Sequence, residues 1–563
     1  MNIIRIPNME IAGSEKLPIT VGVVGHLNAI TTVEHKQKIE QLFIDLATKY
    51  PNSPICLFSS VAEGADRFVA KIFLDLKRIH KEYKERFELI IPLPFKNEEY
   101  KNDFNNDSDK EFDDLVKQAK RKFCIGSDST KTDGAEYYLE TGKFVADSSL
   151  ILLALWDGQE GKKGGTADIV NYKRRGDDAD IERSTFEYEG SVFVLPCKRN
   201  TNTGRIESDQ KQDIELSLEA ILKDSSIKEA LGKIEEINSD SFKITQKARK
   251  RSQDFLITNP EEPDAPRKSI LNLYSVLDLL SLRFHKRYMH TVIWLFVTGL
   301  FIVISLAIYT NLWENKIALS IAMLLIVLAG IIYFFSRITK DHSKYLYNRT
   351  LAEALRIQFY WNIAGINQNV SDYILRIHRK EFTWMEHILS SIYGITYINK
   401  PISSGAINDL TTNWVKNQVA FFESSIRRMT KKLTQYRIIS NLSFIIAFGL
   451  LLSIFFLEQF YVRNNYINYL QVVIGTLLSI FALIRAFIQI KGYGQLLNQY
   501  ELMNVLYQKA GQKIDQISST MLESDKQHAY LKELFFIIGK EALIENGNWY
   551  LILKEKEPGL EGI

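Results

Sequence analysis

Four long apolar runs in the second half of the chain limit the folds that are open to it. They cover residues 291–309, 317–335, 438–456 and 469–490. Each run is close to the roughly 20 residues that an α-helix needs to cross the hydrocarbon core of a membrane. The runs also come in two closely spaced pairs, which is rare among the buried helices of water-soluble proteins. We therefore predict an all-α membrane region of four transmembrane helices in two hairpins.

Basic residues flank the outer ends of both predicted hairpins, while the loops inside the hairpins hold only Lys316 and Arg463. The flanking basic residues are Arg283, Lys286, Arg287, Arg337, Lys340, Lys344, Arg427, Arg428, Lys431, Lys432, Arg437 and Lys491. Because short segments rich in Lys and Arg stay in the cytoplasm, we expect a multi-pass protein of the cell inner membrane with cytoplasmic N- and C-termini. The first residues also lack the apolar core of a signal peptide. Arg485 lies near the inner end of the last run, where its side chain can reach the interface; a pore or gating charge is the alternative.

The two hairpins look like copies of one unit. In both, a basic helix leads into the membrane and an amphipathic helix leaves it, with the sequence KYLYNRTLAEALRIQFYWNIAGI after the first hairpin. This arrangement resembles SLATT domains, which are two-transmembrane effector modules of bacterial nucleotide-signalling and conflict systems. The predicted units cover residues 283–370 and 427–534. Apolar stripes at helical spacing on the exit helices indicate contacts between helices and a homo-oligomer.

Shorter apolar runs recur in the N-terminal part of the chain. They cover residues 19–25, 54–60, 87–93, 149–158 and 191–196, and helical patterns separate them around residues 33–50, 64–82, 109–121 and 135–147. Strands that are buried on both faces of a parallel sheet have such uninterrupted apolar sequences. The alternation of strands and helices therefore predicts an α/β, Rossmann-like domain with a parallel sheet.

Small and polar residues follow three of these predicted strands. Ligands of parallel sheets bind beyond the carboxyl ends of the strands, where Gly and Ser let a phosphate approach the backbone closely. Three such loops at one edge predict a phosphate-bearing ligand, with a purely steric use of the glycines as the alternative. The candidate ligand-binding residues are Gly25, His26, Ser59, Ser60, Glu63, Gly64, Asp66, Arg67, Asp157, Gly158, Gly164, Gly165 and Thr166.

Residues 17–198 resemble the SLOG superfamily of Rossmann-like nucleotide-binding domains. The resemblance rests on the sequences SSVAEGADR, EYYLETGKFVADSSLILLALWDG and GKKGGTADIV. It implies a ligand derived from a nucleotide, such as ADP-ribose or NAD. It also implies that a phosphate or ribose site is lined by Gly25, Ser60, Gly64, Gly164, Gly165 and Thr166. Arg67 is expected either to pair with a phosphate or to lie at the surface or beside Asp66.

One position departs from the enzymes of this superfamily. The phosphoribohydrolases carry a catalytic Glu in a Gly-Gly-x-Gly-Thr-x-x-Glu loop, and alignment on Gly165 and Thr166 places Ile169 there. Asp168 is one residue early, and one helical position turns a side chain by about 100°. We therefore predict a sensor without catalytic residues. His26 is expected to contact the ligand or donate a hydrogen bond, with a general base as the alternative.

The intervening segments are predicted to be helical or exposed. Residues 199–282 form a helical linker and residues 371–426 a helical connector, with Trp384 and Trp414 as packing anchors. The tail, residues 535–563, ends in a strand-like sequence, NWYLILKEK.

Together these predictions describe a membrane-bound bacterial effector. Its cytoplasmic domain would sense a nucleotide second messenger and trigger membrane disruption or pore formation by the hairpins in the lipid bilayer. The resemblance implies anti-phage defence and a messenger-producing enzyme encoded alongside. The alternatives are a membrane-tethered nucleotide hydrolase or N-glycosidase that uses the same residues, and a scaffold that binds no nucleotide.

Composition excludes some other partners. Lys and Arg number 70 and Asp and Glu 67, so the charge balance gives no reason to expect nucleic acid. Cys56, Cys124 and Cys197 lie far apart and form no Cys/His metal pattern. We predict no metal and no cofactor, and we expect these cysteines to be packing residues.

Overall fold

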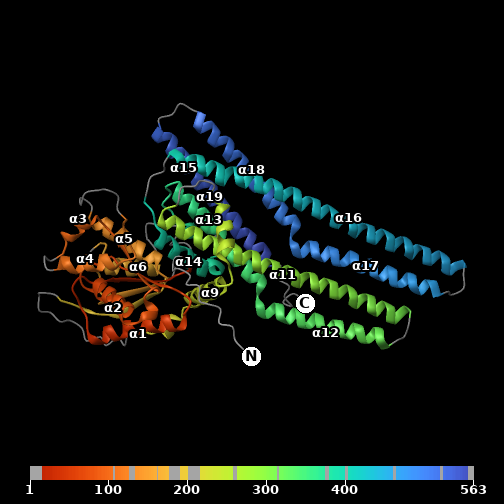
Figure 1. Cartoon of the computed structure of the whole chain (residues 1–563), viewed down its shortest axis with the longest axis horizontal. Helices are drawn as coiled ribbons and strands as arrows, with labels where there is room; N and C mark the ends of the chain where they lie inside the picture. The colour runs from red at the N-terminus through yellow and green to blue at the C-terminus, as the bar shows by residue number, and fades with distance from the viewer. Residues whose placement is uncertain are drawn as a thin grey trace. The chain divides into compact units, whose positions relative to one another are not determined.

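The computed structural model divides the chain into two compact units. Unit 1 comprises Met1–Phe255, Asn259–Val276 and Leu351–Ile402, and unit 2 comprises Leu256–Thr258, Leu277–Thr350 and Ser403–Ile563 (Figure 1). The structure describes residues 15–104, 108–125, 134–161, 163–175, 190–200, 216–257, 263–312, 316–374, 379–399, 404–460, 465–519 and 524–555.

Unit 1 is built on a sheet of six parallel strands in the order β5-β4-β3-β1-β6-β7. All residues of β3 are buried, as are all residues of β6 except Trp156, as expected for a sheet covered on both faces. The predicted α/β fold with a parallel sheet is confirmed. The strand bounds are Ile19–Gly25 for β1, Ile55–Phe58 for β3, Phe87–Leu93 for β4, Arg121–Cys124 for β5, Ile151–Trp156 for β6 and Val192–Pro196 for β7.

Different helices cover the two faces of this sheet. The helices α1 (Val33–Lys49) and α2 (Ala65–Ile79) cover one face, where the ring centroids of Phe43 and Phe73 lie 5.0 Å apart. The helices α5 (Gly134–Ser148) and α6 (Thr166–Arg175) cover the other face (Figure 1). Alongside α2 lies α4 (Asp109–Gln118). All of these helices except α6 were predicted from the sequence.

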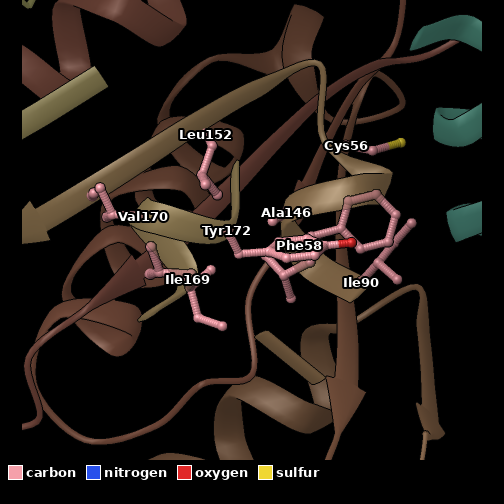
Figure 2. Packing of buried hydrophobic residues seen from close by; sticks show 11 residues of the cluster. Cys56, Phe58, Ile90, Ala146, Leu152, Ile169, Val170 and Tyr172 are labelled. Atoms are coloured by element: carbon pink, nitrogen blue, oxygen red, sulfur yellow. The ribbon is translucent and has the colours of Figure 1, made fainter. Parts of the chain in front are cut away.

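The core between the sheet and α5 and α6 is a single buried cluster. It includes Phe58 from β3, Leu152 from β6, Ala146 from α5 and Ile169 from α6 (Figure 2). Because successive side chains of a strand alternate between faces, Cys56 shares this cluster with Phe58. Cys56 and Cys197 are fully buried, which agrees with the predicted packing role.

Two helices from distant parts of the sequence complete unit 1. The helix α9 (Ser225–Ser241) comes from the predicted linker, and α14 (Arg379–Thr396) comes from the predicted connector. In α9 the Asn238 side chain accepts a hydrogen bond of 2.8 Å from the Leu17 amide and donates one of 2.9 Å to the Leu17 carbonyl. The predicted linker and the predicted connector therefore each contribute a helix that packs in the α/β unit.

Unit 2 contains the helices predicted to cross the membrane. Four helices are long and apolar enough to span a bilayer, as predicted, and they hold the four apolar runs. Many large apolar side chains on them are exposed, including Leu324 at 70%, Phe335 at 60% and Phe455 at 66%. Exposed apolar surface on this scale requires a lipid or protein partner. The four helices are α11 (Ala265–Asn311), α12 (Lys316–Thr339), α16 (Asn417–Phe460) and α17 (Asn465–Lys491).

The second hairpin packs along its length. Ala447 and Ile454 of α16 form a small buried cluster with Ile474 of α17. Near the other end of the same helices, Arg485 Nη2 donates a hydrogen bond of 2.8 Å to Asn441 Oδ1. Arg485 thus connects the two helices of its own hairpin.

The chain after the second hairpin is helical. The helices α18 (Tyr493–Ser519) and α19 (Ser524–Lys554) follow the membrane segment, and the prediction of a strand in the tail was wrong. Apolar residues of the tail face other helices: Phe535 stacks on Trp414 with ring centroids 6.0 Å apart. Trp414 and Trp384 are both buried, which confirms their predicted packing role. Helical packing of this kind overrides the local preference of Trp and Tyr for strands.

Candidate functional site

The sheet of unit 1 has one topological switch point, between β1 and β6. The chain runs from β1 through β3 and β4 to β5 on one side, then crosses β1 to form β6 and β7 on the other. In open parallel sheets the crevice for ligands lies beyond the carboxyl ends of the strands at such a point. Gly25 is the last residue of β1 and His26 follows it, while Asp157 and Gly158 follow β6. Four candidate residues from the sequence therefore meet at the switch point.

His26 and Asp157 are in direct contact there. His26 Nε2 lies 3.0 Å from Asp157 Oδ1 and accepts a hydrogen bond of 3.2 Å from the Asp157 amide. If Nε2 carries a proton, it donates to the carboxylate. If it does not, it accepts from the amide, so this nitrogen has a partner in either protonation state.

Arg199 joins this pair and was not predicted from the sequence. Its Nε lies 2.6 Å from Asp157 Oδ2 and donates to His26 Nε2 at 3.3 Å, while its Nη2 donates to Asp157 Oδ1 at 3.0 Å. Arg199 belongs to β8 (Lys198–Arg199), which pairs antiparallel with β2 (Ala29–Ile30). This short ribbon carries the guanidinium to the ends of β1 and β6. The only signal in the sequence is that Lys198 and Arg199 closely follow the last strand.

Burial and charge set the protonation of this cluster. Burial, followed by the positive charge of Arg199, lowers the pKa of His26, and the attraction of Asp157 only partly opposes this. Burial favours the neutral form of Asp157, but hydrogen bonds from Arg199 and the Gln159 amide prevail and hold the pKa of Asp157 below its ordinary value. At neutral pH the cluster therefore consists of a neutral imidazole, a carboxylate and a guanidinium.

The loop after β3 lies against the end of β1. Gly64 has a φ of +81°, and a Cβ there would lie 2.2 Å from the Leu27 carbonyl oxygen. The next amide, of Ala65, donates a hydrogen bond of 3.1 Å to the His26 carbonyl. Only glycine fits both the left-handed backbone and this close approach, so Gly64 holds the start of α2 beside His26. Val61 in the same loop also has a positive φ, of 47°.

Ser59, Ser60 and Asp66 stabilise this loop from inside. Ser59 Oγ accepts a hydrogen bond of 3.1 Å from the Val61 amide. Burial raises the pKa of Asp66 to about 7, although hydrogen bonds from the Ala62 and Ser60 backbone oppose the shift. These contacts give the side chains of Ser59 and Asp66 a structural role.

Arg67 points into the protein. Its side chain is almost fully buried, with Nε donating to the Val61 carbonyl at 2.9 Å and Nη1 to the Ser108 carbonyl at 2.9 Å. Its ion pair is with Glu111, at 3.3 Å, rather than with Asp66. The prediction that Arg67 is a surface or Asp66-paired residue was wrong, and its buried position does not favour a phosphate partner either. Glu63, from the same loop, accepts a hydrogen bond from the Ser108 hydroxyl.

The Gly-Gly-Thr loop has its own internal cap. The Gly164 amide donates a hydrogen bond of 2.8 Å to Asp168 Oδ2. Gly164 has a φ of +80°, and a Cβ there would lie 2.8 Å from the Ala135 carbonyl oxygen. Gly165 follows, and Thr166 begins α6. Asp168 therefore orders the loop that precedes its own helix.

Ile169, which the resemblance aligns with the catalytic Glu of the phosphoribohydrolases, belongs to the core. It is 3% exposed, and a Cβ added to Gly142 of α5 would lie 2.5 Å from its Cδ1. Figure 2 places it among the apolar residues between the sheet and the helices. A carboxylate at this position would lie in this apolar cluster.

No protein-family model matches the chain, and no curated protein matches it. Among the residues that the structure describes, no group of three or more His, Cys, Asp or Glu side chains could hold a metal ion.

Proposed function

We propose that this protein is a membrane-bound sensor in which unit 1 binds a nucleotide-derived messenger and the helices of unit 2 respond in the lipid bilayer. The observation that carries the proposal is the cluster of His26, Asp157 and Arg199 at the switch point of a parallel sheet. The resemblance to SLOG and SLATT domains adds the ligand class, an ADP-ribose or NAD derivative, and the response, which is membrane permeabilisation in anti-phage defence.

The chemistry of the cluster fits a ribose phosphate. Among the described residues, the hydrogen bonds of the Arg199 guanidinium are donated by Nε and Nη2, and none is donated by Nη1. A guanidinium edge of this kind binds phosphate oxygens in a charge-assisted way. The Asp157 carboxylate is an acceptor for ribose hydroxyls. Gly25 and Gly64 let the loops after β1 and β3 pack closely beside it, since a Cβ on Gly25 would lie 2.3 Å from Ala65 Cβ.

Two features support a sensor over an enzyme. Ile169, which the resemblance aligns with the catalytic Glu of the phosphoribohydrolases, is an apolar residue and is buried. The Nε2 atom of His26 is already engaged by Asp157 and Arg199. A hydrolase or N-glycosidase that uses the same residues remains an outcome of the experiment below.

Ligand binding is tested on the full-length protein in detergent, with ADP-ribose and NAD as probes. At a ligand concentration of 100 times Kd, binding stabilises the folded state by about 2.7 kcal/mol, so thermal unfolding should shift upwards. Arg199→Gln should weaken binding about tenfold or more, since hydrogen bonds to charged groups contribute about 1.5–3 kcal/mol. Arg78→Gln is the matched control, because the Arg78 side chain is 78% exposed and its ion pair is with Asp75 of its own helix.

Chromatography of the same samples separates the alternatives. An unchanged ligand with a thermal shift supports the sensor. Conversion of the ligand, abolished in Arg199→Gln, supports the enzyme. If neither probe shifts unfolding or is converted, the proposal for these ligands fails.

The membrane response is tested with the protein in lipid vesicles that contain a fluorescent dye. The ligand that binds should release the dye from vesicles with the wild-type protein and release much less with Arg199→Gln. Binding without release would leave the sensor in place and contradict the permeabilisation.

A further inference from the structure

The helix α16 carries a group of basic residues shortly before its apolar segment. We refer to four of these exposed residues as the basic face: Arg427, Arg428, Lys431 and Lys432. No acidic residue occurs between Glu423 and Glu458. The helix runs without interruption over Asn417–Phe460, so the helix itself sets the position of these charges relative to the apolar segment.

The basic face points away from the packed side of α16. At about 100° per residue, the four side chains fall within an arc of roughly 140°. The opposite side holds the buried residues Phe422 and Leu433. Phe422 packs against Tyr500 of α18, with ring centroids 5.4 Å apart. The packing of unit 2 therefore leaves the charged side uncovered.

The apolar segment that follows is uncovered as well. Ile438 is 52% exposed, Ile439 49% and Leu442 52%. At 1.5 Å per residue, Lys432 lies about 9 Å and Arg427 about 17 Å before Ile438 along the helix axis. The polar headgroup layer adds roughly 5–8 Å to each side of the hydrocarbon core, and the long Lys and Arg side chains can extend towards it.

The other helix of the hairpin adds positive charge at the same end. Lys491, the last residue of α17, lies close enough to Lys432 for the two charges to repel. Arg437 is exposed between the basic face and the apolar segment. A nearby layer of negative charge would relieve this repulsion.

We propose that the basic face binds the phosphate headgroups of anionic lipids in the leaflet that borders this end of the second hairpin. Clusters of four or more Lys and Arg residues beside a membrane helix are attracted to anionic lipids, and the attraction falls off over about a Debye length, close to 8 Å in physiological salt. The apolar segment places Lys431 and Lys432 within this range of the headgroup layer, and Arg427 and Arg428 lie about one helical turn further out. That placement favours a lipid over a soluble acidic protein.

The test measures lipid retention by the full-length protein. The protein is purified in a neutral detergent, supplied with equal amounts of phosphatidylglycerol and phosphatidylcholine, and analysed by native mass spectrometry. The wild-type protein should retain phosphatidylglycerol preferentially. The variant with Arg427→Gln, Arg428→Gln, Lys431→Gln and Lys432→Gln should bind it about tenfold or more weakly.

The matched control removes four exposed lysines from α18 and α19 and should behave like the wild-type protein. It carries Lys509→Gln, Lys513→Gln, Lys526→Gln and Lys532→Gln. Both variants should unfold at the wild-type temperature in neutral detergent, which establishes that they are folded. Equal retention of phosphatidylglycerol by the wild-type protein and the basic-face variant would overturn the proposal. Displacement of the lipid by millimolar inorganic phosphate, or tight binding of an acidic peptide in preference to the lipid, would also overturn it.

Discussion

Thr20 in β1 and Ser391 in α14 form a hydrogen bond of 2.7 Å between their hydroxyl oxygens, although 371 positions separate them in the sequence. Both side chains are buried, and Thr20 Oγ1 also accepts a hydrogen bond of 3.0 Å from the Leu150 amide. Ser391 lies between the two membrane hairpins in the sequence. A residue of this connecting segment therefore belongs to the interior of the α/β unit.

The fit of α14 on the sheet predicts opposite effects for two Gly→Ala substitutions. A Cβ on Gly394 would lie 2.4 Å from Ser148 Cβ and 2.8 Å from Phe58 Cζ. Gly394→Ala should therefore lower the free energy of unfolding by about 1–3 kcal/mol through overpacking. Gly232→Ala in α9 is the control, because nothing lies within 4 Å of the new Cβ. It should raise stability by up to about 1 kcal/mol through helix propensity. Thermal unfolding of the full-length variants measures both, and a stabilised Gly394→Ala would contradict the packing.

Asp66 should make stability fall as pH rises. Burial raises the pKa of Asp66 from 3.8 to about 7, so between these values the folded state binds the proton more tightly than the unfolded chain. The stabilisation is fully present below about pH 4 and is lost as pH rises through about 7, with a size on the order of 4 kcal/mol at about 1.4 kcal/mol per pKa unit. Asp66→Asn should remove this dependence. From pH 5 to pH 8, the unfolding free energy of the wild-type protein should fall relative to that of the variant. A constant difference would exclude the raised pKa.

Arg199 should control the protonation of His26. Burial is the larger cause of the lowered pKa of His26, and the positive charge of Arg199 is the second. Arg199→Gln should therefore raise that pKa. The pH dependence of hydrogen exchange at the imidazole C2 position, followed by mass spectrometry, reports this value directly. Because the folded pKa is depressed, the wild-type protein loses stability as pH falls below the ordinary value near 6.5, and the variant should lose less of it. His80 is an internal control, since it is remote from Arg199 in sequence and its Nδ1 lies 3.6 Å from Glu82 Oε1. If the pKa of His26 were the same in the variant, the contact between Arg199 and His26 would be contradicted.

The contact between Arg485 and Asn441 should couple the helices of the second hairpin. Hydrogen bonds between membrane helices contribute about 0.6 kcal/mol on average and at most about 1.7 kcal/mol. A double-mutant cycle with Arg485→Leu and Asn441→Leu, measured by unfolding in detergent, should give a coupling energy in this range. A value near zero would mean that Arg485 only reaches towards the interface, as a snorkelling side chain does.

Local sequence patterns were sufficient for the elements that bury a large apolar area. The runs that became β1, β4 and β6 and the four long helices were predicted because their apolar character repeats over their whole length. Strand β5 was missed because its sequence, RKFC, is short and half charged. It lies at the edge of the sheet and is held by pairing with β4. Its strand conformation comes from the neighbour rather than from its own residues.

The candidate site divides in the same way. Gly25, His26, Gly64 and Asp157 were found from the sequence, since each follows a recognisable strand or begins a helix. Arg199 was not found, because its place depends on the pairing of β8 with β2. These strands are far apart in the sequence: Lys198 pairs with Ile30, which lies 168 positions earlier. Arg67 was misjudged because burial depends on α4 and Phe104, whose ring lies 4.4 Å from its guanidinium carbon.

The sequence by itself determined the parallel sheet, the four membrane-length helices and the small and polar residues at the carboxyl ends of the strands. Those features depend on hydrophobic periodicity and on backbone chemistry, which act over neighbouring residues. Only the tertiary structure decided that α14 belongs to the α/β unit and that Arg199 completes the cluster with His26 and Asp157. Such contacts depend on long-range packing, where the fit of Gly394 against Ser148 or the pairing of two short strands outweighs any preference of the local sequence.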